Sequence, residues 1–184
     1  MHLQQSDLHA PRETEFDEWM QEMLADAMDE DDLASFTYGT SFPSISRTKQ
    51  VYVDGSCLRQ ASTHAAAGAG IFWGPNNPAN KGVRVPGEQT NNRAELFAIL
   101  TVLADTPTNV PLDFRTDSLY AIETIVTQGL SLAQRGWKCA NNDLLKAIQY
   151  QIRRRPVSVQ FHHVRGHTGN FSNEEADRLA KLGA

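Results

Sequence analysis

Long apolar runs, cysteine and a basic leader are all scarce in this sequence of 184 residues. No stretch approaches the roughly 20 apolar residues that cross a bilayer. The first 30 residues are acidic and lack the basic and apolar regions of a signal peptide. The two cysteines, Cys57 and Cys139, have no metal-ligand or redox spacing and are expected to be unpaired thiols. These absences predict an intracellular protein of the nucleus or cytoplasm, neither secreted nor bound to a membrane.

Net positive charge is also lacking, because the whole chain carries −5, and this argues weakly against a polyanionic ligand. The average conceals two unlike regions. Residues 1–48 hold eleven acidic and two basic residues, a net charge of −9, whereas residues 49–184 come to +4. We therefore divide the chain into an acidic N-terminal extension with a linker (1–48) and a domain (49–184) whose charge is compatible with a nucleic acid.

The acidic extension contains an amphipathic pattern whose apolar members recur at helical spacing: Phe16, Trp19, Met20, Met23, Leu24, Ala27 and Met28. We expect a helix that packs on its own domain or remains from a larger polyprotein; a helix that docks on a protein partner is the alternative. Residues 36–48 are rich in Ser, Thr, Gly and Pro and indicate a linker. A further hypothesis is that the extension folds over the basic domain and mimics nucleic acid.

From residue 49 onward, strand patterns and helix patterns alternate. Strands are expected at 50–55, 67–73, 82–86, 111–116 and 157–164, and helices at 92–104, 118–127, 142–154 and 173–182. The Gly-interrupted stretch 128–140 lies between two of these helices. Three hairpin-connected strands followed by two α–β units predict an α/β fold, in which helices pack against a mixed sheet.

Four carboxylates occupy particular places in this pattern: Asp54, Glu95, Asp117 and Asp177. Asp54 is expected to end the first strand. It is either a turn residue or a carboxylate that faces a cation. Glu95 has the capping-box spacing from Asn92, and Asp117 could be only the N-cap of the next helix. Asp177 is harder to explain structurally, because Glu174 and Arg178 already provide an i,i+4 surface pair on its helix. If the first and fourth strands are neighbours, Asp54 and Asp117 would face each other across roughly 5 Å.

Carboxylates so close together repel each other and need a compensating cation. Ligand sets made only of oxygen select hard ions such as Mg²⁺ or Mn²⁺ rather than zinc. Two such ions about 4 Å apart form the clamp used for in-line phosphoryl displacement. The residues themselves therefore predict metal-dependent phosphodiester chemistry.

Four blocks of the domain resemble a type 1 ribonuclease H, in the family's order: VYVDGS (51–56), QTNNRAEL (89–96), TDSLYAI (116–122) and VRGHTGNFSNEEADRLA (164–180). The resemblance covers residues 49–184. It implies a ribonuclease H-like five-stranded mixed sheet flanked by helices and two Mg²⁺ ions, for which Mn²⁺ can substitute. It also implies endonucleolytic hydrolysis of the RNA strand of RNA–DNA hybrids, which leaves 5′-phosphate and 3′-hydroxyl ends.

By the same resemblance, Asp54, Glu95, Asp117 and Asp177 correspond to the family's metal-binding carboxylates. His167 corresponds to a loop histidine that assists proton transfer or product release. Flanking Gly166 and Gly169 favour a loop that can move. Gly55 and Ser56 are expected to form a tight exit from the first strand, which leaves the Asp54 carboxylate accessible.

Five further residues are expected to contact the substrate. Asn91 and Asn92 match residues that reach bases and 2′-hydroxyls, and amides can both donate and accept hydrogen bonds. Thr90 and Asn141 match groups that hold a phosphate of the DNA strand. Trp137 has two open interpretations, stacking against the nucleic acid or anchoring in the core.

The sequence departs from the family pattern in two places. Glu88 stands where some eukaryotic members have a basic residue. The basic protrusion is short and keeps only Arg135, Trp137 and Lys138. Arg153–Arg155 add charge, which is expected to be solvated at a helix end or available to a nucleic acid. These features suggest a compact, monomeric form without a separate hybrid-binding module, and a retroelement origin is a hypothesis.

Two other functions compete with an active hybrid-specific ribonuclease. The first is a hybrid-binding protein that no longer cuts, which the complete set of carboxylates and His167 disfavours. The second is another nuclease or an integrase on the same fold. Exonuclease relatives show D-x-E on the first strand, whereas Asp54 is followed by Gly55 and Ser56.

Overall fold

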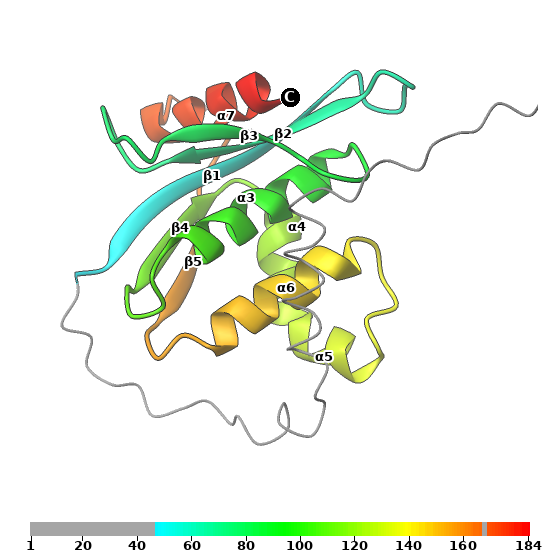
Figure 1. Ribbon diagram of the computed structural model, residues 1–184, viewed down its shortest axis with the longest axis vertical. Helices are drawn as coiled ribbons and strands as arrows, with labels where there is room; N and C mark the ends of the chain where they lie inside the picture. Colours follow the sequence, from blue (N-terminus) through cyan, green and yellow to red (C-terminus); the bar gives the residue numbers. More distant parts are fainter. Residues whose placement is uncertain (1–46, 167–168) are drawn as a thin grey trace, which may run out of the picture.

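The computed structural model describes residues 47–166 and 169–184, which form a five-stranded sheet with helices on both faces (Figure 1). The order across the sheet is β3-β2-β1-β4-β5. The pairs β1–β2 and β2–β3 are antiparallel, and β1–β4 and β4–β5 are parallel, so the predicted mixed sheet is confirmed. The strands are β1 (Lys49–Leu58), β2 (Ala66–Phe72), β3 (Lys81–Arg84), β4 (Leu112–Thr116) and β5 (Val159–His163).

The helices fall into two layers. In Figure 1, α7 covers one face of the sheet, over β1 to β3, and α3, α4 and α6 lie on the other. Their bounds are α3 (Asn91–Asp105), α4 (Leu119–Ile122), the π-helix η1 (Glu123–Thr127), α5 (Gly129–Gln134), α6 (Asn142–Arg153) and α7 (Phe171–Gly183). Within 47–166 and 169–184, no helix is long and apolar enough to span a membrane. The helix and linker predicted for the acidic extension lie almost wholly outside the described residues.

The main core lies between the sheet and α3. Val51 and Val53 of β1 alternate onto this face and are fully buried. Phe114 of β4 stacks on Phe161 of β5, with ring centroids 5.0 Å apart and planes 10° from parallel. The apolar positions expected on one helix face, Leu96, Ile99, Leu100 and Leu103, are all buried, as is most of the rest of α3. Each side chain of this size stabilises the fold by about 1.5–3 kcal/mol through removal from water.

On the opposite face, glycines let α7 lie directly on the sheet. A Cβ atom at Gly70 of β2 would overlap the carbonyl oxygen of Ala176, and one at Gly82 of β3 would overlap that of Leu179. The small residues of β2 therefore bring the backbone of α7 into contact with the strands. A second apolar cluster of Phe72, Ala176 and Leu179 completes this layer.

The region after β4 differs from the expected helix and irregular stretch. The predicted helix 118–127 is an α-helical turn, α4, followed by the wider π-helix η1, and α5 forms inside the Gly-interrupted stretch. The Gln149 side-chain amide donates to the Ile125 carbonyl at 2.9 Å. That contact from α6 compensates for the altered backbone bonding of η1, and local periodicity could not reveal it.

Arg155 follows the C-terminal end of α6 but is neither solvated nor available to a nucleic acid, so both expectations were wrong for it. It is 6% exposed. Its guanidinium donates to the carbonyls of Leu103 and Thr106 at 2.6 Å each, Pro107 at 3.0 Å and Val110 at 3.3 Å. Arg155 thus donates to carbonyls at and just after the C-terminal end of α3, where a helix leaves its last carbonyls without amide partners.

Candidate active site

The parallel pairing of β1 with β4 ends just before two acidic residues. It runs from Lys49 opposite Leu112 to Tyr52 opposite Arg115. Asp54 and Asp117 each lie two residues beyond the last pair. The prediction that Asp54 ends its strand was wrong, because β1 continues beside β2 with Asp54 opposite Gly70. The crevice where parallel strands diverge is where open α/β sheets commonly bind ligands.

Close packing of α3 on β1 delivers the third carboxylate, Glu95. A Cβ atom at Gly55 would overlap the backbone nitrogen of Glu95, so Gly55 is required for this approach. It is not the exit from the strand that the sequence suggested, since the strand continues to Leu58. The expected capping box was also wrong. Thr90 is the N-cap and accepts a hydrogen bond from the Arg93 amide at 3.2 Å, whereas Asn92 lies inside the helix.

Asp54, Glu95 and Asp117 form one cluster, in which one carboxylate oxygen from each lies within 4.8 Å of the others. Asp54 and Glu95 are 7% and 8% exposed. Glu95 Oε2 is buried and has no hydrogen-bond partner among the described residues. An unpartnered buried carboxylate oxygen beside two other carboxylates is unfavourable unless a cation compensates it.

The electrostatics of the cluster indicate the same requirement. Burial, followed by the charges of Asp117 and Asp177, raises the pKa of Asp54 from 3.8 to about 7, despite a 2.7 Å hydrogen bond from the Gly55 amide. Burial and the charges of Asp54 and Asp117 raise the pKa of Glu95 well above its usual value. The three residues present only oxygen donors, and they fit a divalent cation of the Mg²⁺ or Mn²⁺ kind.

Asp177, on α7, is not one of these three residues. Its charge contributes to the raised pKa of Asp54, so it lies nearby, but its carboxylate accepts from Lys181 Nζ at 2.6 Å. The predicted Glu174–Arg178 pair was wrong, because Arg178 turns to Glu175, with a shortest distance of 3.0 Å. The role of Asp177 as a metal ligand stays a prediction.

Asn173 is a residue of the site that the sequence interpretation missed. It lies on α7 one turn before Asp177 and is 3% exposed. Its Nδ2 donates to Asp117 at 3.2 Å, and its Oδ1 is buried without a partner in the described part of the chain. Gly166 packs on the same Asp117 carboxylate, where a Cβ atom would overlap it. The i,i+4 spacing of Asn173 from Asp177 was the only feature of the sequence that could have indicated its place in the site.

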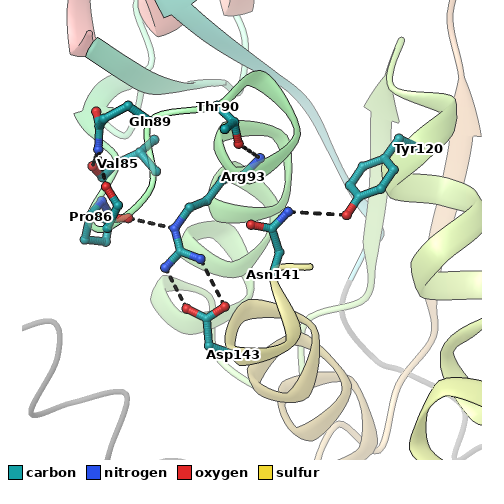
Figure 2. A network of polar contacts seen from close by, with 9 residues as sticks. Val85, Pro86, Gln89, Thr90, Arg93, Tyr120, Asn141 and Asp143 are labelled. Carbon is teal, nitrogen blue, oxygen red and sulfur yellow. Dashed lines mark hydrogen bonds and ion pairs between the residues drawn. The ribbon is translucent and has the colours of Figure 1, made fainter. Parts of the chain in front are cut away.

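Four of the five predicted substrate residues lie at the N-terminal ends of two helices. Asn91 and Asn92 are exposed in the first turn of α3. Asn141, which precedes α6, has a left-handed backbone (φ 55°) and donates to the Tyr120 hydroxyl at 3.3 Å (Figure 2). Trp137 is half-buried against the main core cluster, which supports its interpretation as a core anchor. Its contact with a nucleic acid stays a prediction.

His167 lies outside the described residues, so its predicted role is not tested. The described residues beside it include Gly166, which packs on Asp117, and Gly169, whose φ of +79° favours glycine. Glu88, the acid expected to weaken the grip on a DNA strand, is exposed.

The order of strands, the helices on both faces and the buried carboxylates at the β1–β4 divergence define a protein of the ribonuclease H-like class. The family model for RNase H matches residues 46–184, and the chain belongs to this family. The resemblance inferred from the motifs is confirmed.

Three relatives illustrate the match. Human ribonuclease H1 is 38% identical over 140 residues, covering 73% of this chain and 49% of the relative. The ribonuclease H of Schizosaccharomyces pombe is 37% identical over 164 residues, 84% of this chain and 61% of the relative. The crystal structure of LC9-RNase H1, described as a type 1 RNase H with the type 2 active-site motif, superposes with a TM-score of 0.58 at 28% identity, covering 79% of this chain and 74% of that one. The chain thus spans about half the length of the mammalian relatives it matches.

Proposed function

We propose that this chain is an endoribonuclease that hydrolyses the RNA strand of RNA–DNA hybrids and leaves 5′-phosphate and 3′-hydroxyl ends. The observation that carries the proposal is the buried cluster of Asp54, Glu95 and Asp117 in a chain of the RNase H family. Proteins named ribonuclease H that match the domain over most of its length support the same activity.

Two Mg²⁺ ions are the proposed cofactor, with Mn²⁺ as a substitute. Asp54, Glu95 and Asp117 would hold them, and Asp177 would contribute from α7. Bound divalent ions supply an activated water and stabilise the leaving oxygen of a phosphodiester. The protein contributes rigid placement, because Gly55 sets the approach of Glu95 and Asn173 holds Asp117. His167 would accept or donate a proton beside this cluster.

The exposed amides of Asn91 and Asn92 are proposed to recognise the RNA strand. They lie one helical turn before Glu95, so a strand that they contact runs past the carboxylates. Amide groups can hydrogen-bond to a 2′-hydroxyl as donor and as acceptor, which distinguishes RNA from DNA. Thr90 and Asn141 would hold a phosphate of the DNA strand. The Thr90 oxygen accepts from Arg93, and its hydroxyl hydrogen can still donate to that phosphate.

The decisive experiment incubates labelled RNA–DNA, RNA–RNA, DNA–DNA and single-stranded RNA with the full chain, in Mg²⁺ or in EDTA. We expect cleavage of the hybrid alone, on its RNA strand, and only with Mg²⁺. Asp54→Asn should lower kcat on the order of 10³-fold, because it removes one of the oxygens that hold the cations. Asp105→Asn is the matched control, since Asp105 is an exposed acid at the far end of α3.

Three outcomes would contradict the proposal. Cleavage of duplex DNA with the hybrid left intact would indicate a different nuclease on this fold. Hybrid binding without any Mg²⁺-dependent cleavage would indicate a binding protein. Near-normal turnover by Asp54→Asn would mean that the carboxylate cluster is not the active site.

A further inference from the structure

An ion pair with one buried partner joins the N-terminal ends of α3 and α6. Arg93, the third residue of α3, is 8% exposed. Its guanidinium donates to both carboxylate oxygens of Asp143, from Nη1 at 3.0 Å and from Nη2 at 2.6 Å (Figure 2). Two parallel hydrogen bonds fix the direction as well as the distance between the partners, which a lysine could not do.

The same arginine also binds the loop that leads into α3. Arg93 Nε donates to the carbonyl of Pro86 at 2.7 Å. Gly87 lies against the guanidinium with φ +74°, and a Cβ atom there would come within 3.1 Å of Nη2. The Arg93 amide donates to the Thr90 hydroxyl. Arg93 therefore connects three segments: the loop before α3, the start of α3 and the start of α6.

Thr90 and Asn141 lie on the two sides of this connection. Thr90 immediately precedes α3 and Asn141 immediately precedes α6. Figure 2 shows Asn141 between Arg93 and Tyr120, to which its side chain donates. The Asn141 side chain does not cap its own helix. Because each residue is anchored at the start of its helix, the pairing of Arg93 with Asp143 sets the separation of these two polar groups.

The charges of Arg93 and Asp143 cancel, so the pair does not itself attract a phosphate. It affects phosphate binding through the position of the residues that it holds. Burial alone raises the pKa of Asp143, but the hydrogen bonds and charge of Arg93 outweigh it and lower the pKa overall. Asp143 is therefore ionised, and Arg93 neutralises it. An unpaired Asp143 carboxylate would repel a phosphate from the first turn of α6.

We propose that the Arg93–Asp143 ion pair is a positioning element, which holds Thr90 and Asn141 at the separation required to grip one phosphate of the DNA strand. It thereby helps the chain to select a hybrid over an RNA duplex. The inference rests on the proposed function, and it gives Arg93 and Asp143 a role through the residues that they hold rather than by contact with the substrate.

Asp143→Asn tests the proposal because two explanations predict opposite signs. Loss of a negative charge near a polyanion should by itself tighten binding. Loss of positioning should weaken it. We expect KM for the hybrid to rise about tenfold, with kcat within about twofold of the parent, since the interaction lost is made equally in the ground state and in the transition state. The affinity for Mg²⁺ alone, measured by calorimetry, should be unchanged.

A second measurement separates the loss of an uncharged contact with a phosphate from a change in charge. In an Asp54→Asn background, which prevents cleavage, hybrid binding is followed by fluorescence anisotropy as the salt concentration rises. Because Thr90 and Asn141 are uncharged, their contact with a phosphate releases no counterion, so Asp143→Asn should lower log K by about one unit at every salt concentration without reducing the slope of log K against log salt. Asp105→Asn, which breaks the exposed Lys81–Asp105 pair at the other end of α3, is the matched control for the loss of one acid and should not lower log K. Asp143→Glu keeps a carboxylate and should recover part of the affinity.

Unchanged or tighter hybrid binding by folded Asp143→Asn would overturn the inference. If thermal melting shows that this variant is unfolded, Arg93→Lys serves instead. It keeps the charge but not the bidentate contact, and the same loss of affinity is expected at every salt concentration. A parent chain that does not cleave the hybrid contradicts the proposed function and, with it, this inference. A parent that cleaves, with variants that bind as well as it does, contradicts the inference alone.

Discussion

At the scale of single residues, the site consists of carboxyl groups that destabilise one another's charge. Asp54 and Glu95 are both buried, and burial together with the charge of Asp117 raises the pKa of each, while the charge of Asp54 raises that of Glu95 further. In the absence of a cation, protonation is the remaining way to reduce that repulsion. Proton binding and cation binding at Asp54 therefore compete.

This competition predicts how stability depends on pH. The pKa of Asp54 is about 7 in the folded chain, whereas 3.8 is the ordinary value that represents the unfolded chain. The folded chain therefore binds this proton more tightly than the unfolded chain does. Its contribution to stability is complete below about pH 4 and is lost as the pH rises through 7. In EDTA, the free energy of unfolding of the parent should therefore fall as the pH rises from 5 to 8. The fall should be larger than that of Asp54→Asn by on the order of 2–4 kcal/mol.

Urea unfolding at several pH values, in EDTA and in Mg²⁺, measures this difference. Mg²⁺ should stabilise the parent more at pH 8 than at pH 5.5, because protons no longer compete for the carboxylate. Equal pH dependence in the parent and in Asp54→Asn would show that Asp54 is not the group responsible.

Two arginines show how context decides the role of a residue type. Arg93 and Arg155 are both buried, 8% and 6% exposed. Arg93 meets a carboxylate at the start of α6, whereas Arg155 meets four backbone carbonyls at the end of α3. The run Arg153–Arg155 indicated a charged surface, and only packing revealed that one member faces inward.

At the scale of elements, the position of α7 depends on glycine. The helix carries Asn173, which holds Asp117, and Asp177, whose charge acts on Asp54. Its backbone touches the sheet at Gly68 and Gly70 of β2 and at Gly82 of β3. A Cβ atom at any of these positions would push the helix away, and the carboxylate cluster would lose its support from that side.

Gly70→Ala should therefore impair both folding and activity. Its Cβ would overlap the carbonyl of Ala176, the residue before Asp177, so relief requires a shift of that part of α7. We expect a loss of about 1–3 kcal/mol in the free energy of unfolding, together with weaker Mg²⁺ binding.

Gly68→Ala is the matched comparison, because its Cβ would meet the C-terminal end of α7, at Ala180 and Ala184. It should lose a similar amount of stability but retain more of the activity. Equal activity losses in the two variants at equal stability would show that the placement of Asp177 and Asn173 is not the cause.

At the scale of the whole molecule, charge is divided between two regions of opposite sign. The domain of residues 49–184 carries +4 and the acidic extension −9. The described part of the domain has its own core between the sheet and α3. The division of the chain at residue 48 stays a prediction, as does the hypothesis that the extension competes with nucleic acid.

Deletion of residues 1–48 should accordingly tighten hybrid binding, most strongly at low salt, where screening is weakest. Fluorescence anisotropy at about 50 and 200 mM salt measures the gain in hybrid affinity. The Asp54→Asn substitution is present in both the full chain and the truncated chain. An extension of equal length with its acids changed to amides controls for bulk. If the truncated chain binds as the full chain does at every salt concentration, the extension does not act as a mimic.

Much of the fold follows from local patterns. Apolar runs between turn-rich pieces placed the strands, and helical patterns placed α3, α6 and α7, because these signals reflect the geometry of one element. The helix expected after β4 does run to residue 127, but its π-helical second half, where Gln149 of α6 donates to the Ile125 carbonyl, was not predicted. A contact between residues so far apart along the chain leaves no local pattern.

The sequence by itself determined the family, the carboxylates that are candidates for the site and the division of charge, since these depend on residue type and order alone. Only the tertiary structure decided that Asp54 and Asp117 lie just past the end of the parallel pairing, and that Gly55 admits Glu95. It also decided the inward direction of Arg155 and the pairing of Arg93 with Asp143. The physical reason is that burial and contact depend on how distant elements pack, and close packing selects partners that no local spacing encodes.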